Sequence, residues 1–245
     1  MSFDDGYRED EKLIEIFDRF GIRGTFHINS GLLYRDIRVD DDEVARIYEN
    51  HEISAHGYTH ANFDELTEAE ITAEIEKDCK KLKALSGREI LGMSYPNGKT
   101  SEKAYRVAKR LGIVYSRTTV STAGFDIPEN FLYWHPTCHH LQSEEATARF
   151  LNSSRGGELL CIWGHSVEFE SAGNWSLIER VSEKLGNSPD VWSATCIELC
   201  DYVRAFRSII VSPDGKDIEN PTDIDIWLSL DGKTICVKAG ERLHI

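Results

Sequence analysis

Short β-rich segments alternate along this sequence with amphipathic helical segments, and this alternation restricts the fold to the α/β class. Residues 9–20 carry four large apolar side chains at helical spacing, and Gly21 follows as a typical helix stop. Residues 24–29, Gly-Thr-Phe-His-Ile-Asn, then favour a strand. The same succession predicts further helices over 41–50, 67–85, 101–111, 143–153, 175–185 and 195–206, and strands over 52–55, 90–94, 113–116, 159–163 and 191–194.

Strands joined by helices of roughly 10–15 residues indicate βαβ units and therefore a parallel sheet. A chain of 245 residues is long enough for such a sheet to form a single α/β barrel. The first strand is expected to be unusually short, because Asp4 lies three residues after Met1. From Ser208 onward, β-rich runs are separated by turn signals. We therefore predict a barrel domain over residues 1–207 and a small C-terminal β-extension over residues 208–245 that packs on it.

The charge of the chain limits the classes of partner. Asp and Glu number 42 against 28 Lys and Arg, which gives a formal net charge of −14. Such a surface repels nucleic acid and anionic lipid, so neither is an expected partner. There is no apolar run long enough to span a bilayer, and the first residues lack a signal-peptide pattern. We expect a cytoplasmic protein with no membrane insertion, although a trimmed start would leave secretion open. The six cysteines form no C-x-x-C pair and are expected to be reduced and mostly buried.

Two motifs bring acidic and imidazole groups to predicted strand ends. Asp4 and Asp5 are adjacent and precede Gly6, and such close like charges favour a neutralising cation. His56 and His60 follow the strand over 52–55 and, on one helical turn, would reach a common point. With one carboxylate, two imidazoles make a three-ligand metal site that leaves open positions. Either aspartate can supply that carboxylate. The alternatives are a surface loop for the acids and ordinary loop histidines for the pair.

Two further motifs follow later strands. Tyr95-Pro96-Asn97-Gly98 is a turn that can point backbone N–H groups at an oxyanion, or it is a plain structural turn. His165 ends the predicted strand over 159–163, where side chains of an α/β barrel face the active site. A lone histidine in this position is otherwise a satisfied structural residue.

In this order, the four motifs resemble the polysaccharide deacetylase family, carbohydrate esterase family four. Residues 3–6 are similar to its first motif and residues 56–60 to its second. Residues 94–98 resemble the third motif and residues 162–166 the fifth, so the resemblance spans roughly residues 1–206. It implies a distorted (β/α) barrel of about seven parallel strands.

The resemblance also implies a role for each motif. Asp5, His56 and His60 would bind a divalent metal, usually Zn²⁺, with Co²⁺ or Ni²⁺ as alternatives. Asp4 would be the general base and His165 the general acid. The metal and a backbone N–H near Asn97 would bind the oxyanion.

The other expected substrate contacts are Tyr95 and Pro96 in the third motif, with Trp134 and His139 in the His-rich segment 134–140. That segment would line the substrate site or supply a partner for His165. The alternatives are metal binding by its histidines and a half-exposed loop with stacked rings.

This sequence departs from the family pattern at three places. Ser94 stands where the family often has an arginine that contacts the catalytic base, and Gly57 where Ser or Thr is usual. The fourth motif, an Asp and a Trp that orient the acid, is not clear; Asp126 and Trp134 are the nearest residues. The expected function is therefore a deacetylase acting on an acetylated glycan. The alternatives are a hydrolase of a non-sugar amide or ester, and a catalytically silent carbohydrate-binding protein.

Overall fold

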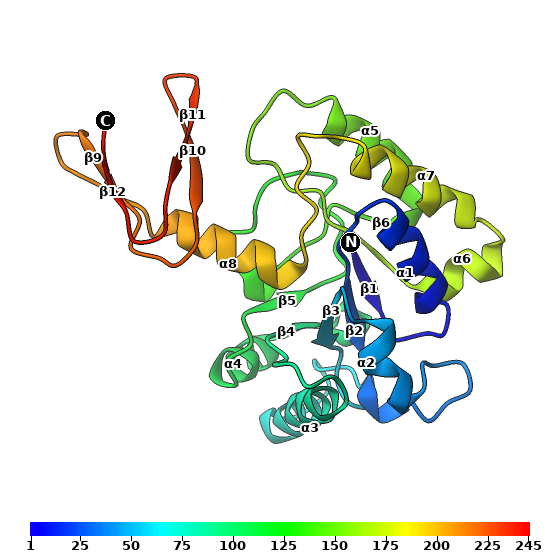
Figure 1. The fold of residues 1–245 in the computed structure, drawn as a ribbon. Helices are drawn as coiled ribbons and strands as arrows, with labels where there is room; N and C mark the ends of the chain where they lie inside the picture. Colours follow the sequence, from blue (N-terminus) through cyan, green and yellow to red (C-terminus); the bar gives the residue numbers. More distant parts are fainter. The chain divides into compact units, whose positions relative to one another are not determined.

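The computed structural model describes all 245 residues, and the chain separates into two compact units, Met1–Ile197 and Glu198–Ile245. The first unit is built on one parallel sheet with the strand order β5-β4-β3-β2-β1-β7-β6 (Figure 1). The sheet curls into a half-barrel, which confirms the predicted distorted (β/α) barrel of seven parallel strands. Its strands are β1 Ser2–Asp4, β2 Thr25–Ile28, β3 Glu52–Ala55, β4 Gly92–Ser94, β5 Tyr115–Arg117, β6 Cys138–His139 and β7 Ile162–Gly164.

Helices connect most of these strands and cover the outside of the sheet. The longest begins with a capping box in which Thr67 and Glu70 each accept a hydrogen bond from the other's backbone N–H. It ends at Gly87, whose φ of 71° suits glycine. The helices are α1 Asp10–Arg19, α2 Val44–Ile47, α3 Glu68–Ser86, α4 Glu102–Arg110, α5 Ser143–Leu151, α6 Ser166–Ala172, α7 Trp175–Gly186 and α8 Cys196–Arg207. None of them is long and apolar enough to cross a bilayer.

The two faces of the sheet bury different chemistry, as period-two strands allow. On the helix side, Phe3 packs against Phe17 and Phe26 with ring centroids 5.9 and 6.4 Å apart. On the inner side, Ser2 Oγ lies 2.8 Å from the His27 ring and accepts a hydrogen bond from Arg117 Nε of β5. The apolar face supplies the core, so the inner face is free to hold the polar groups that follow the strand ends.

Three predicted elements differ from the structure. Residues 41–50 form only a short 3₁₀ turn and the four-residue α2. Residues 191–194 form no strand, and the Arg23 N–H donates to Ser193 Oγ at 2.7 Å. The seventh strand is instead β6, which is two residues long and lies in the His-rich segment 134–140, where no strand was predicted. β6 forms because it pairs with β7. Two residues are too few to show the alternation of apolar and polar side chains that identifies a strand in a sequence.

The second unit contains two small antiparallel sheets. In the longer hairpin, Asp231 and Gly232 both have positive φ, 48° and 74°, as a tight two-residue turn requires. The strands are β8 Ile210–Val211, β9 Asp217–Glu219, β10 Ile226–Leu230, β11 Lys233–Val237 and β12 Arg242–His244. The packing of residues 208–245 on the barrel stays a prediction.

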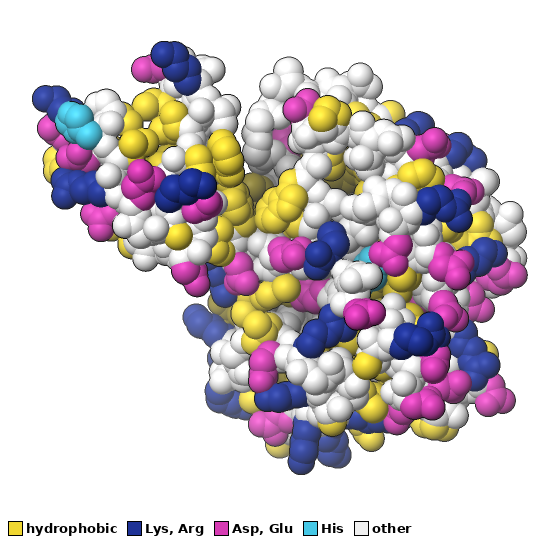
Figure 2. All heavy atoms as spheres, in the orientation of Figure 1, with side chains coloured by type: hydrophobic (Ala, Val, Ile, Leu, Met, Phe, Trp, Pro, Cys, Tyr) yellow, Lys and Arg dark blue, Asp and Glu magenta, His cyan; other side chains and the backbone are white.

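Acidic and basic side chains are interspersed over the face drawn in Figure 2.

A buried carboxyl group links helices α1 and α6. Asp10 is 1% exposed and accepts hydrogen bonds of 2.6 Å from Tyr48 Oη and Ser166 Oγ. Burial raises the pKa of Asp10 to about 7, although the two hydroxyl donors oppose this shift.

This shift makes a prediction about stability. Unfolded Asp10 releases its proton near pH 4 and folded Asp10 near pH 7, so its contribution to the free energy of unfolding falls as pH rises through that window. Asp10→Asn removes the titration. Relative to the variant, the wild type should lose up to a few kcal/mol between pH 4 and pH 7, measured by urea unfolding. Other carboxyl groups titrate in both proteins and cancel. If the difference in unfolding free energy between wild type and Asp10→Asn stayed constant with pH, the raised pKa of Asp10 would be contradicted.

Candidate metal centre and active site

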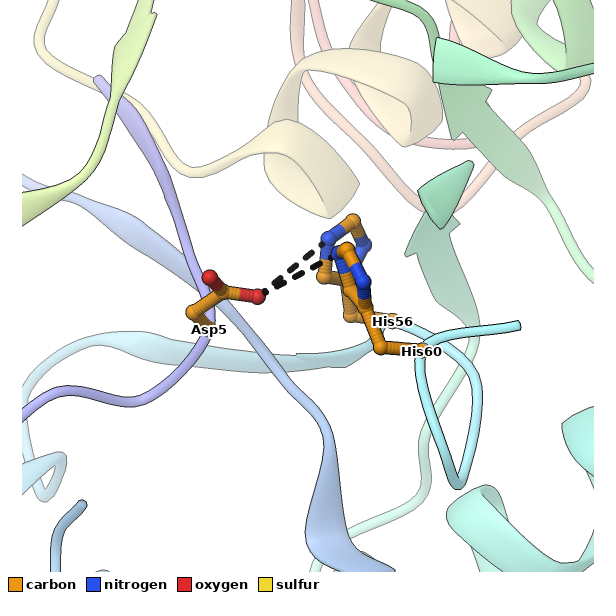
Figure 3. Close-up of side chains that lie close together, drawn as sticks. All are labelled: Asp5, His56 and His60. Atoms are coloured by element: carbon orange, nitrogen blue, oxygen red, sulfur yellow. Dashed lines mark ion pairs between the residues drawn. The ribbon is translucent and has the colours of Figure 1, made fainter. Parts of the chain in front are cut away.

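Two imidazoles and a carboxylate from separate motifs meet at the carboxyl end of the sheet. Asp5 follows β1, while His56 follows β3 and His60 lies in the loop after it. Asp5 Oδ1 lies 3.6 Å from His56 Nε2 and 3.6 Å from His60 Nε2 (Figure 3). The structure thus brings together the three residues that were expected to bind metal.

The charge and spacing of this group fit a divalent cation. Asp5 Oδ1 is buried and has no hydrogen-bond partner, which is costly for a carboxylate oxygen unless a cation balances it. Tetrahedral ligands at zinc-like bond lengths lie about 3.3–3.5 Å apart, close to the two distances seen here. Burial and the charge of His56 lower the pKa of His60 to about 4. His60 is therefore neutral at pH 7, as a ligand must be.

Ser94 fixes the orientation of the His56 ring. His56 Nδ1 lies 3.0 Å from the backbone oxygen of Ser94 and 2.6 Å from its Oγ. Since a carbonyl oxygen only accepts, Nδ1 carries the proton and the Nε2 lone pair faces Asp5. Gly57 has φ of 75°, and a Cβ there would lie 3.1 Å from the Pro96 ring. Backbone conformation and space therefore explain why glycine stands where Ser or Thr was expected.

Backbone strain is concentrated around this group. Asp5, His60 and Asn97 are non-glycine residues with positive φ, at 84°, 63° and 54°. The Asp5 N–H donates to the His27 carbonyl at 2.7 Å, and Arg38 donates to the Asp5 carbonyl at 2.6 Å. Strained conformations persist only where surrounding contacts enforce them, and they cluster at functional sites.

The arginine that the third motif lacks is supplied by another strand. Arg117, at the end of β5, forms a buried ion pair and hydrogen bond with Asp4 Oδ1. Ser94 pairs with Arg117 in the sheet register and donates to the same carboxylate at 3.0 Å. Burial would raise the pKa of Asp4, but the charge of Arg117, with smaller contributions from nearby histidines, holds it well below its usual value. Asp4 is therefore ionised throughout the neutral range.

His165 lies beside Asp4 and is held by a carboxylate of its own helix. Phe3 pairs with Gly164, so the same register places Asp4 next to His165. His165 Nδ1 lies 3.2 Å from Glu168 Oε1, one helical turn ahead. Burial lowers the pKa of His165, but the hydrogen bond to Glu168 and the charges of the aspartates outweigh it, so the net shift is upward. Asp126 is exposed and pairs with Arg155 instead.

The remaining predicted site residues lie at different depths. Tyr95 and Pro96 are buried, and Tyr95 Oη donates to the Leu132 carbonyl at 3.0 Å. Asn97 is exposed and donates to Asn62 Oδ1 at 2.9 Å. Trp134 is 2% exposed and packs edge-on against Tyr115 and Phe131. His139 Nε2 lies 3.1 Å from Glu168 Oε2, which brings it to the His165 end of the site. The substrate roles of these residues stay predictions.

Sequence reasoning missed Arg117, Glu168 and Asp78. Asp78, on α3, is buried and accepts hydrogen bonds of 2.8 Å from the backbone N–H groups of His56 and Ser30. Arg117 and Glu168 left a usable signal: a charged residue directly after a predicted strand, and an acid three residues after a strand-end histidine. Asp78 left none, because a single acid on an amphipathic helix is normally at the surface.

Removing the Ser94 hydroxyl should loosen the metal site without unfolding the protein. Ser94→Ala leaves the carbonyl that accepts from His56 but removes the link from His56 to Asp4. We expect metal affinity to fall about tenfold or more, measured by chelator competition. Ser182→Ala, a buried serine of α7 with no partner for its Oγ, is the matched control and should leave affinity unchanged. Equal losses in both variants would contradict the role of Ser94.

Comparisons with known proteins show which family and which folds this chain resembles. Residues 1–116 match the polysaccharide deacetylase family model. A chitin deacetylase of Arthroderma benhamiae is 34% identical over 79 residues, which are 31% of this chain and only 21% of that protein. The family 4 carbohydrate esterase of Streptomyces lividans, solved with acetate, has a TM-score of 0.55 at 16% identity, covering 79% of this chain and 89% of that one.

A second solved structure has a similar fold. It is the Xyl-CE4 domain of a multidomain xylanase from the hindgut metagenome of Trinervitermes trinervoides, with a TM-score of 0.57 at 18% identity. The match covers 86% of this chain and 90% of that one. At such identities the likeness supports the fold. The matched residues 1–116, just under half of this chain, make it similar to the polysaccharide deacetylase family.

Proposed function

We propose that this protein is a metal-dependent hydrolase that removes N- or O-linked acetyl groups from a carbohydrate. The observation that carries the proposal is the buried, unpartnered Asp5 Oδ1, 3.6 Å from two imidazole nitrogens. An ionised carboxylate and an imidazole with a raised pKa lie at the same strand ends. A metal site, a base and an acid are the groups that metal-dependent amide or ester hydrolysis uses.

Asp5, His56 and His60 would hold the metal. The set of two imidazoles and one carboxylate suits Zn²⁺, with Co²⁺ and Ni²⁺ as alternatives. A divalent ion bound there would supply Lewis acidity, which polarises the acetyl carbonyl and makes a water molecule more acidic. The hydrogen bonds that His56 donates to the Asp78 carboxylate and the Ser94 carbonyl keep it in place for this role.

Asp4 would accept the proton of the attacking water. Arg117 and Ser94 both hold its Oδ1, which orients the carboxylate and keeps it ionised. The same ion pair makes Asp4 a weak base, so proton transfer to it requires a water that has been made more acidic. The metal site and the base therefore depend on each other.

His165 would protonate the leaving group. Its raised pKa favours the imidazolium form near neutral pH, and Glu168 holds Nδ1, so Nε2 is left as the donor. This step matters most for an N-acetyl group, because an amine leaves poorly without a proton.

The backbone N–H of Asn97, in the strained turn after β4, is the proposed oxyanion donor.

An acetylated glycan is the proposed substrate. The chitin deacetylase match makes an N-acetylated oligosaccharide the first choice. The proposed substrate contacts remain Tyr95, Pro96, Trp134 and His139. Tyr95, Pro96 and Trp134 are buried, so they would act indirectly, by supporting the turn or loop that meets the substrate.

Acetate release from a panel of glycans tests the proposal directly. The panel holds chitooligosaccharides, peptidoglycan fragments and acetylated xylan, each with added Zn²⁺ or Co²⁺ and with chelator. We expect release from at least one substrate, loss on chelation and recovery when metal is returned. No release from any substrate by protein that has bound metal would overturn the proposal and favour a non-sugar substrate or a silent binding protein.

Replacing Asp4 should separate catalysis from metal binding. Asp4→Asn keeps the size of the side chain and the hydrogen bond from Ser94 but cannot accept the proton. We expect turnover to fall by about 10²–10⁴-fold while one ion is still bound, measured by acetate release and metal analysis. Asp126→Asn, at an exposed ion pair, is the control and should retain full turnover. An active Asp4→Asn protein would exclude Asp4 as the base.

A further inference from the structure

A second group of two imidazoles and one carboxylate lies at the end of the neighbouring strands. His139 ends β6, His165 follows β7, and Glu168 lies on α6. One donor atom from each lies within 4.8 Å of the other two. Glu168 Oε1 is 3.2 Å from His165 Nδ1, and Glu168 Oε2 is 3.1 Å from His139 Nε2. The composition is the same as that of Asp5, His56 and His60.

Hydrogen bonding in this second group is incomplete. Glu168 Oε2 is buried and makes no hydrogen bond of acceptable geometry, although His139 Nε2 and His140 Nδ1 are within 3.2 Å. Both ring nitrogens of the fully buried His140 likewise make no hydrogen bond. Gly164 makes room for this ring, since a Cβ there would lie 2.2 Å from His140 Nδ1. A buried carboxylate oxygen that lies beside two imidazole nitrogens without a well-formed hydrogen bond is an arrangement that suits a cation ligand.

We propose that His139, His165 and Glu168 form a second divalent-metal site. Imidazole nitrogen and carboxylate oxygen suit Zn²⁺, Co²⁺ and Ni²⁺. The separations of 3.1 and 3.2 Å are close to the roughly 3.3–3.5 Å between tetrahedral zinc ligands, so small movements would admit an ion. The side chains of His139, His165 and Glu168 are 20%, 26% and 41% exposed, which leaves a path from solvent.

Occupation of this site would stop the reaction, a consequence that rests on the proposed function. A metal ion on His165 Nδ1 takes the lone pair that otherwise holds a proton, and Glu168 can no longer hold the ring as an imidazolium. The ring then cannot act as the acid. One site thus supports catalysis and the other inhibits it at high metal concentration.

Counting bound ions tests the proposal without relying on activity. Protein freed of metal by chelation is titrated with Zn²⁺ in competition with a chromophoric chelator. The wild type should bind two ions with different affinities. His139→Gln and Glu168→Gln should each bind only the tighter ion, whereas His60→Gln should retain only the weaker one. His135→Gln, in the same segment but bonded to Thr118, is the matched control and should bind two.

Several outcomes decide the question. Saturation of the wild type at one ion shows that Glu168 only holds the imidazoles, and it overturns the proposal. Two ions in both His139→Gln and Glu168→Gln place the second ion elsewhere and overturn it as well. If two ions bind and the predicted variants lose one, the site is established even when no glycan releases acetate. Where acetate is released, excess Zn²⁺ should slow the wild type by at least about tenfold and slow His139→Gln far less, each compared with its own rate at one ion.

Discussion

The structure depends on how two adjacent carboxylates are accommodated at the end of β1. Asp4 and Asp5 are both buried, and neighbouring buried charges are tolerated only with compensating cations. Asp4 has a permanent one in Arg117. Asp5 has Arg38 at 3.5 Å on Oδ2, but its Oδ1 faces the imidazoles of His56 and His60 and has no hydrogen-bond partner. Asp5 Oδ1 is therefore the carboxylate oxygen at which we propose that a metal binds.

The curled sheet makes this arrangement possible because the register of its strands sets the polar contacts. Ile28 pairs with Ala55 and Ala55 with Met93, so His56 and Ser94 fall in one row, and Ser94 pairs with Arg117. The apolar partners of these residues face the helices and supply the core. A shift of one residue in any of these pairings would turn the polar row outward, so the hydrophobic face that stabilises the barrel also fixes the site.

Much of the fold and the three candidate metal ligands could be predicted because their signals are local. Asp5, His56 and His60 each follow a recognisable strand, and the alternation of strands and helices indicates a parallel sheet. Arg117 could not be assigned to Asp4, because that contact depends on the register between β4 and β5. Strand β6 was missed because two residues carry no period. The predicted strand over 191–194 was wrong because the Arg23 N–H donates to the Ser193 side chain of that segment and not to its backbone.

Two clusters of the same composition differ in how firmly the chain holds them, and this difference orders their expected affinities. His56 is held at its backbone by Asp78 and at its ring by Ser94, and Asp5 is fixed by two hydrogen bonds to its own peptide units. His165 and Glu168 begin a helix of seven residues, and Glu168 is held only by the imidazoles that it faces. A preformed site loses less conformational entropy when an ion binds. The Asp5 group should therefore fill first, and an ion at Glu168 should follow only at higher metal concentration.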